Sequence, residues 1–129
     1  MRYLLDSHTW LWWLSADPRL GAGAAQILAD PEVELFLSAA TGWELTIKIS
    51  VGKLVLHYSL DEVLREQRLR HHVVWLDITS EHCRALAPLP FHHRDPFDRL
   101  LIAQALQEGM ALLSADVQFD AYSVTRIWD

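Results

Sequence analysis

Four carboxylates stand where apolar runs give way to helices, a setting that can build an acidic metal site. The set comprises Asp6, Glu44, Asp98 and Asp116. Because the carboxyl ends of parallel strands meet at one edge of a sheet, where ligands bind, these side chains are expected to converge. Converging carboxylates raise one another's pKa unless cations compensate, and hard divalent ions with oxygen ligands suit such a cluster. The pattern indicates a site for Mg²⁺ or Mn²⁺.

Each of these acids also has a purely structural explanation, which the sequence leaves open. Asp95, immediately before a proline, is a strong helix start, and Asp98 three residues later approximates a capping box at the positive end of the helix dipole. Asp6 can cap the helix that follows it. Glu44 has a lysine four residues on, and an exposed pair of that spacing contributes only about 0.2–0.5 kcal/mol. Capping explains each acid singly, but not why four acids occupy corresponding ends of elements.

Nitrogen and sulfur ligands are poorly placed for a metal. Cys83 is the only cysteine, which excludes an intrachain disulfide and a thiolate metal site and favours a reducing compartment. The seven histidines include the adjacent pairs His71-His72 and His92-His93, whose side chains point apart on regular structure. The HExxH spacing of zinc enzymes does not occur. Oxygen ligands therefore remain the favoured donor set.

The elements that must position the acids alternate along the chain. Apolar runs predict strands at 3–5, 35–38, 73–76, 111–113 and 124–127. Helical patterns fill the intervals at 9–14, 22–29, 41–50, 59–70, 79–88 and 95–108. This alternation predicts a single α/β domain over residues 1–129, a three-layer α/β/α sandwich with a mostly parallel central sheet.

The last of these helices is the one around which the site is organised. It begins at Asp95, ends at Gly109, and carries two apolar rows at helical spacing, so it is expected to bury much of its circumference. The rows are Phe97, Leu101 and Ala105, and Ile102 with Leu106.

Composition limits the possible classes of protein. The chain has 129 residues of which 51% are hydrophobic, which is enough to bury about two thirds of its unfolded surface in one core. No apolar stretch approaches the roughly 20 residues of a membrane helix, so a cytoplasmic protein without a membrane partner is expected. The net charge of −6 argues against a polyanion binder. That objection fails if the acids hold divalent cations where a phosphate would land.

The ordered motifs of the chain resemble a known family. They are Asp6-Ser7-His8-Thr9 running into Leu11-Trp12-Trp13, Trp43-Glu44 with Lys48 and Gly52-Lys53-Leu54, Arg94-Asp95-Pro96-Phe97-Asp98-Arg99 with Ala103-Gln104-Ala105, and Leu113-Ser114-Ala115-Asp116 with Phe119. Over nearly the whole chain, the sequence is similar to the PIN-domain family, and within it to VapC-type toxins of bacterial toxin–antitoxin pairs.

The resemblance implies a ribonuclease that hydrolyses RNA phosphodiester bonds with Mg²⁺ or Mn²⁺, leaving 5′-phosphate and 3′-hydroxyl ends. The implied catalytic and metal-binding residues are Asp6, Glu44, Asp98 and Asp116. The possible auxiliary residues are Asp95 and Asp120 as further acids, Ser7 and Ser114 as flanking hydroxyls, and Arg94 and Arg99 as phosphate contacts or as partners in surface salt bridges. The resemblance also implies a homodimer and a cognate antitoxin protein that covers the acidic site.

Two other classes of protein remain as alternatives. Haloacid-dehalogenase-like phosphatases also place an aspartate after the first strand, but they need a second aspartate two residues later, where this chain has His8. A non-catalytic protein-binding module would use its acids only as caps and its tryptophans as a partner surface. Trp10, Trp12 and Trp13 could stack on bases, but tryptophan at helical spacing is usually buried in a core or a subunit contact.

Overall fold

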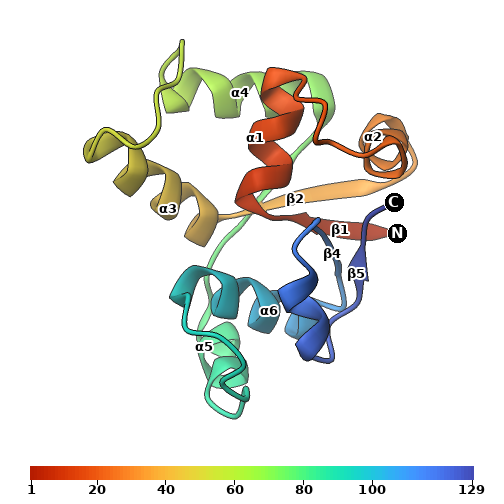
Figure 1. The fold of residues 1–129 in the computed structure, drawn as a ribbon, viewed down its shortest axis with the longest axis vertical. Coiled ribbons are helices and arrows are strands. Elements are labelled where there is room, and N and C mark those ends of the chain that lie inside the picture. The colour runs from red at the N-terminus through yellow and green to blue at the C-terminus, as the bar shows by residue number, and fades with distance from the viewer.

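The computed structural model describes all 129 residues and alternates strands with helices (Figure 1). The strands are β1 (Arg2–Leu5), β2 (Glu34–Ser38), β3 (Val74–Leu76), β4 (Ala111–Leu113) and β5 (Arg126–Ile127). The helices are α1 (Ser7–Ser15), α2 (Ala22–Ala29), α3 (Ala39–Ser50), α4 (Leu60–His71), α5 (Ser80–Leu86) and α6 (Pro96–Glu108), with a 3₁₀ turn η1 (Val117–Ala121). Every predicted strand and helix is present. The turn η1 was not predicted.

The five strands form one sheet in the order β3-β2-β1-β4-β5, and every pairing is parallel. The sheet is thus parallel throughout rather than mostly parallel. The chain builds outward from β1 to β3 and then returns to place β4 on the other side of β1. The order therefore reverses between β1 and β4, and the crevice at the carboxyl ends of such strands is where α/β folds bind ligands.

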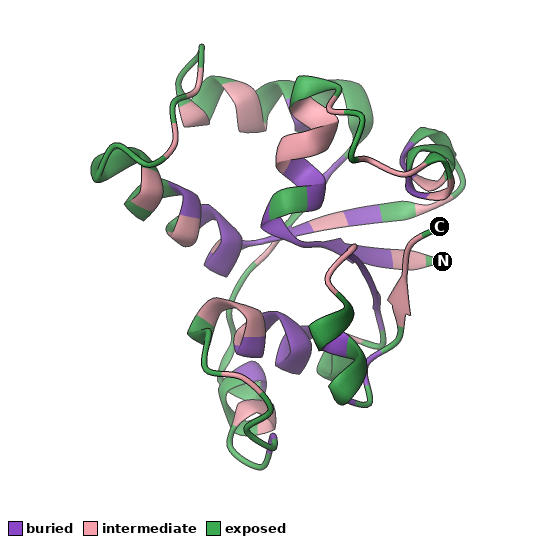
Figure 2. Cartoon of the chain, viewed as in Figure 1, coloured by how far each residue is buried: buried purple, intermediate pink, exposed green.

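Alternation along the strands separates two cores, one on each face of the sheet. Leu5 and Leu113 lie in a cluster with Trp10 of α1, while Leu4 lies in a second cluster with Leu101 of α6. Figure 1 shows α1 to α4 on one side of the strands and α5 and α6 on the other, and the central strands are largely buried (Figure 2). Successive side chains of a strand point to opposite faces, so one short apolar run serves both layers. The predicted three-layer α/β/α sandwich is confirmed.

Helix α6 begins and ends as the sequence predicts. Oδ1 of Asp95 accepts hydrogen bonds from the backbone N–H groups of Phe97 and Asp98, and Gly109 ends the helix with a φ of 67°, which favours glycine. Two predicted details are wrong. Leu106 is 41% exposed, so the second apolar row ends early, and the Asp98 carboxylate does not complete a capping box.

The tryptophans of α1 act as packing residues. Trp10 is fully buried in the core of its face, and Trp12 and Trp13 are partly buried. Trp12 meets Trp128 edge-on at a centroid distance of 6.1 Å, and Trp13 packs on His71 at 4.7 Å. These contacts fit the expected packing role better than base stacking. None of the helices has the length and apolar character needed to cross a bilayer.

Candidate active site

Asp6 lies immediately beyond β1 and is held from two sides. The residue is only 5% exposed, and its Oδ1 accepts a hydrogen bond from the backbone N–H of Thr9 at 2.8 Å. Oδ2 accepts from the Ser114 hydroxyl at 2.5 Å. The Thr9 hydroxyl in turn donates to the Leu113 carbonyl at 2.8 Å. Asp6 is thus a helix cap, as one explanation predicted, and it is also fixed to the end of the neighbouring strand β4.

Asp116 follows β4 in a similar position. Its backbone N–H donates to the Ser114 hydroxyl oxygen at 3.0 Å, and its own Oδ1 accepts from the Gln118 N–H at the start of η1. Ser114 therefore contacts both Asp6 and Asp116, and it is fully buried between them. The predicted role of Ser114 in orienting a carboxylate matches this arrangement. Ser7, the other hydroxyl implied by the resemblance, is buried at the start of α1, but its hydroxyl makes no hydrogen bond.

Glu44 reaches the site from α3, and its helix is fixed against α6. The Ser38 hydroxyl caps α3 at the Ala40 N–H and donates to Oε1 of the fully buried Gln104 on α6. The Glu44 carboxylate is largely buried and forms an ion pair with Lys48 at 3.2 Å. The lysine predicted as a structural partner is therefore present, and it is the cation paired with this carboxylate.

Asp98 lies within electrostatic reach of the other predicted acids. Burial is the largest cause that raises its pKa, from 3.8 to about 7, and the negative charges of Asp95, Glu44, Asp116 and Asp6 raise it further, in that order. The pKa of a carboxyl group responds to charges closer than about a Debye length, because salt screens charges that are farther away. Residues separated by up to 110 positions in the sequence therefore act electrostatically on one carboxyl group.

The donor set of this acidic group fits a hard divalent cation. Carboxylate oxygens are the preferred ligands of Mg²⁺ and Mn²⁺, and a cation would relieve the repulsion that raises the pKa of Asp98. In the present arrangement no three acidic, histidine or cysteine side chains stand close enough to share one ion. The structure thus supplies the charge and the chemistry of a metal site without a finished coordination shell.

Two of the auxiliary acids behave differently. Asp95 is exposed at the start of α6 and is the charge that contributes most to the raised pKa of Asp98, so it belongs to the acidic group. Asp120 forms a bidentate ion pair with Arg126, at 2.8 and 2.9 Å, which holds the pKa of Asp120 below its usual value. Asp120 is not among the charges that act on Asp98. The structure does not bring it to the group.

The two arginines implied as phosphate contacts lie in different environments, one exposed and one buried. Arg94 is exposed and makes no ion pair, so its guanidinium is free to meet a phosphate. Arg99 is 6% exposed and donates to the carbonyls of Pro90 and Leu89 at 2.8 and 3.2 Å, beneath the ring of Phe91. Neither of the two expected roles for Arg99, a phosphate contact or a surface salt bridge, fits this buried position. Arg99 instead clamps the loop between α5 and α6.

That loop carries a residue that the sequence analysis passed over. His93 Nε2 lies 3.5 Å from Oδ2 of Asp98, and its Nδ1 lies 3.1 Å from the hydroxyl of Tyr122. Adjacent histidines were expected to point apart, but the rings of His92 and His93 both pack edge-on against Tyr122, at centroid distances of 4.8 and 5.4 Å. Of the two, His93 is the one that reaches the acids. The position of His93 directly before the Arg94-to-Arg99 motif was the available signal.

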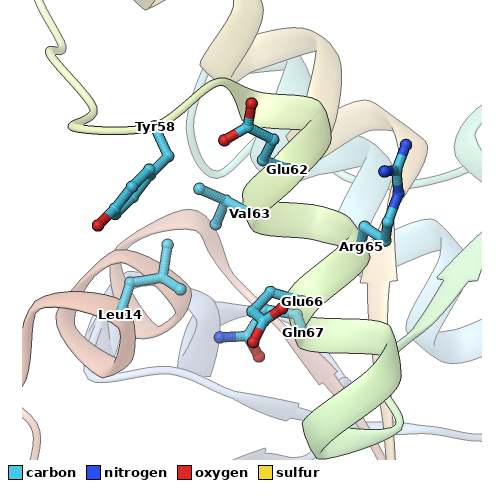
Figure 3. A pocket seen from close by; sticks show the side chains of 7 residues that line it. All are labelled: Leu14, Tyr58, Glu62, Val63, Arg65, Glu66 and Gln67. Carbon is cyan, nitrogen blue, oxygen red and sulfur yellow. The ribbon is translucent and has the colours of Figure 1, made fainter.

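An apolar cavity of about 530 Å³ lies away from the acids, between α1 and α4. Figure 3 shows Leu14, Tyr58 and Val63 gathered around it from α1, the segment before α4 and α4 itself. Leu14 lies eight residues along from Asp6, or roughly 12 Å of helix. None of the acidic group lines this cavity, so it is a separate feature of the surface.

Together, the parallel sheet and the acids at its carboxyl edge define a class of protein, and the comparison with known families agrees. The PIN domain family model matches residues 3–124, so the chain belongs to the PIN-domain family. This membership places it outside the haloacid-dehalogenase-like phosphatases. Among curated relatives, the ribonuclease VapC22 of Mycobacterium tuberculosis is 32% identical over 114 residues, covering 88% of this chain and 85% of that protein.

Solved structures show the same fold at lower identity. The VapBC2 structure from Rickettsia felis, bound to a DNA fragment from its promoter, matches with a TM-score of 0.76 and 15% identity over 100% of both chains. The VapBC-1 structure from nontypeable Haemophilus influenzae matches with a TM-score of 0.65 and 18% identity, covering 98% of this chain and 97% of that one. These likenesses concern the fold alone.

Proposed function

We propose that this chain is a metal-dependent endoribonuclease and the toxin of a toxin–antitoxin pair. The observation that carries the proposal is a set of contacts at the carboxyl edge of the sheet. Ser114 links Asp6 to Asp116, and Trp43 and Phe97, the residues before Glu44 and Asp98, pack edge-on against each other. The negative charges of the other acids also raise the pKa of Asp98. Its support from outside the chain is the ribonuclease VapC22, which is 32% identical over most of both sequences. Lys48 pairs with Glu44 alone, and the remaining negative charge of the group is costly to maintain, so a bound divalent ion would balance it.

The residues proposed to hold Mg²⁺ or Mn²⁺ are Asp6, Glu44, Asp98 and Asp116. Asp6 offers oxygens already oriented by Thr9 and Ser114, so its carboxylate loses little freedom when it binds a ligand. The pKa of Asp98 is raised to about 7, so its carboxyl group must release a proton to become a ligand. A cation bound there would supply positive charge to the scissile phosphate and lower the pKa of the attacking water.

Other side chains of this chain would orient the substrate. Arg94 is the exposed, unpaired guanidinium beside the acids, and its fork of N–H donors suits a phosphate of the RNA backbone. The acids themselves repel phosphates, so RNA binding is expected to require the cation. Cleavage by water attack would leave a 5′-phosphate and a 3′-hydroxyl.

The proposal is tested by incubating the purified protein with single-stranded RNA in Mn²⁺, in Mg²⁺ and in EDTA. We expect cleavage only with a divalent ion, new 5′-phosphate ends, and loss of cleavage in Asp98→Asn. The matched control is Asp61→Asn, which removes an exposed carboxylate that pairs with Arg65 on α4. A wild-type protein that neither cleaves RNA nor binds Mn²⁺ in calorimetry would overturn the proposal in favour of a non-catalytic binding module.

An antitoxin is the proposed partner, and it should carry positive charge. The chain has a net charge of −6, and its acidic group is open to solvent through the partly exposed Asp95 and Asp98. One structural neighbour, from Klebsiella pneumoniae, is a toxin–antitoxin complex. We expect a basic peptide to protect the metal-free protein against thermal unfolding. Equal protection by an acidic peptide would count against this partner.

A homodimer is also proposed, on the resemblance to the family. Several large apolar side chains of α3 are exposed in the single chain, including Trp43 at 61% and Ile47 at 39%. Exposed apolar groups on one helix suit a subunit contact. Sedimentation equilibrium of the wild type and of Trp43→Ser tests it, with a dimer expected only for the wild type.

A further inference from the structure

The loop between α5 and α6 is held in place at two points. The second point includes His93, whose ring faces Asp98. Arg99 donates to the carbonyls of Leu89 and Pro90 and lies 3.7 Å beneath the ring of Phe91. Farther along the loop, the Tyr122 hydroxyl oxygen accepts the backbone N–H groups of His92 and His93, at 3.1 and 3.2 Å. A loop anchored in this way presents the His93 ring in a defined direction.

The same Tyr122 hydroxyl determines the tautomer of His93. A hydroxyl has one proton and two lone pairs, and both lone pairs of Tyr122 are already used by the two backbone donors. The third neighbour of the hydroxyl is Nδ1 of His93, at 3.1 Å. The hydroxyl proton must therefore be donated to Nδ1, which makes Nδ1 an acceptor and places the proton of the neutral ring on Nε2.

The Nε2–H group of His93 then has one acceptor within reach, the carboxylate of Asp98. Nε2 of His93 is buried and makes no hydrogen bond, an arrangement that is unfavourable for a polar atom. The acidic oxygen in front of it is Oδ2 of Asp98, at 3.5 Å, slightly longer than a well-formed hydrogen bond. Hydrogen bonds at active sites are often long before ligands bind and tighten afterwards.

We propose that His93 is a positioning residue for Asp98: Tyr122 directs Nε2–H of His93 toward Oδ2 of Asp98, which would fix the orientation of this carboxylate as a ligand for a divalent cation. This inference rests on the proposed function, because it assigns a second layer of contacts to the same site. Neither His93 nor Tyr122 would touch the cation or the RNA. Groups that hydrogen-bond to ligating carboxylates set the ligand orientation, and their loss typically weakens metal affinity about 10–100-fold.

The test is calorimetric titration of Mn²⁺ into the full chain and its variants. His93→Phe, which keeps a ring but has no N–H, should weaken Mn²⁺ binding roughly 10–100-fold. His93→Gln reaches as far as Nε2 and carries an N–H donor, so it should stay within a few-fold of the wild type. His93→Asn reaches only as far as Nδ1 and should resemble His93→Phe. The matched control is His92→Phe, one residue away and exposed, which should bind Mn²⁺ like the wild type.

Thermal unfolding of each metal-free variant separates positioning from packing. We expect the Mn²⁺ affinity of the variants to depend on whether an N–H donor stands at the Nε2 position, and not on their unfolding temperatures. Equal Mn²⁺ affinity for the wild type and His93→Phe would overturn the positioning role while leaving the proposed function standing. Equal loss in His93→Gln and His93→Phe would show that ring packing matters, and would also overturn it. If the wild type binds no Mn²⁺, the proposed function fails and this inference fails with it.

Discussion

The Ser114 hydroxyl donates to Oδ2 of Asp6 at 2.5 Å, although the two residues are 108 positions apart. The bond is possible because β1 and β4 are parallel neighbours, with Leu5 in register with Leu113, so the residues after both strands emerge at the same level. Ser114 also accepts the Asp116 N–H. One buried hydroxyl thus ties together two acids that come from different parts of the chain.

We predict that Ser114→Ala destabilises the protein by about 2 kcal/mol, since a hydrogen bond to a charged group contributes roughly 1.5–3 kcal/mol. The Asp6 carboxylate would lose one of its two donors in a buried position, and Mn²⁺ affinity should fall because the carboxylate is less well oriented. Urea unfolding and Mn²⁺ titration measure the two effects. Ser123→Ala, at an exposed serine, is the matched control. Identical unfolding curves for the two variants would contradict the role given to Ser114.

The raised pKa of Asp98 predicts a specific dependence of stability on pH in EDTA. The folded protein keeps the proton of Asp98 up to about pH 7, whereas the unfolded chain releases it near 3.8. Between these values the unfolded state binds fewer protons, so the contribution of Asp98 to the free energy of unfolding falls as pH rises from 4 to 7. Because the carboxyl is partly exposed, we expect a loss on the order of 2 kcal/mol rather than the full shift.

Asp98→Asn should remove this loss. The variant is expected to match the wild type near pH 4 and to exceed its stability at pH 8 in EDTA, because the amide carries no charge to repel the other acids. Urea unfolding at a series of pH values gives the difference directly. In Asp61→Asn, which changes an exposed and separately paired carboxylate, the wild-type slope should remain. A parallel pair of curves for the wild type and Asp98→Asn would rule out the raised pKa.

Much of this architecture follows from local patterns. Asp6 and Asp116 directly after strands, and Glu44 and Asp98 near helix starts, predicted that these acids share one edge of the sheet, because a parallel sheet brings the carboxyl ends of its strands together whatever the loops do. The direction of Arg99 was not predictable, because it depends on how the loop over residues 88–94 folds back on α6. The pairing of Asp120 with Arg126 likewise depends on the 3₁₀ turn η1, which has no strong periodic signal in five residues.

Substitution of Asp120 is predicted to leave the acidic group unaffected. Arg126 binds both of its carboxylate oxygens at the surface, and Asp120 adds nothing to the charge felt by Asp98. Asp120→Asn should therefore keep RNA cleavage and Mn²⁺ affinity, with only a small loss of stability, as for exposed ion pairs. Cleavage assays beside Asp98→Asn provide the comparison. If cleavage falls as far as in Asp98→Asn, Asp120 acts at the site after all, as the family resemblance implied.

Arg99 provides the sharpest test of the loop that carries His93. We predict that Arg99→Lys destabilises the protein by about 2–3 kcal/mol, because an ammonium cannot reproduce the fork of guanidinium donors to two carbonyls or the packing under Phe91. Amide hydrogen exchange should quicken at His92 and His93, whose N–H groups are held by Tyr122 only while the loop is in place. Arg94→Lys, at an exposed arginine, should leave both quantities unchanged and raise the KM for RNA instead. The opposite pattern, with Arg99→Lys raising KM at unchanged stability and exchange, would restore Arg99 as a phosphate contact.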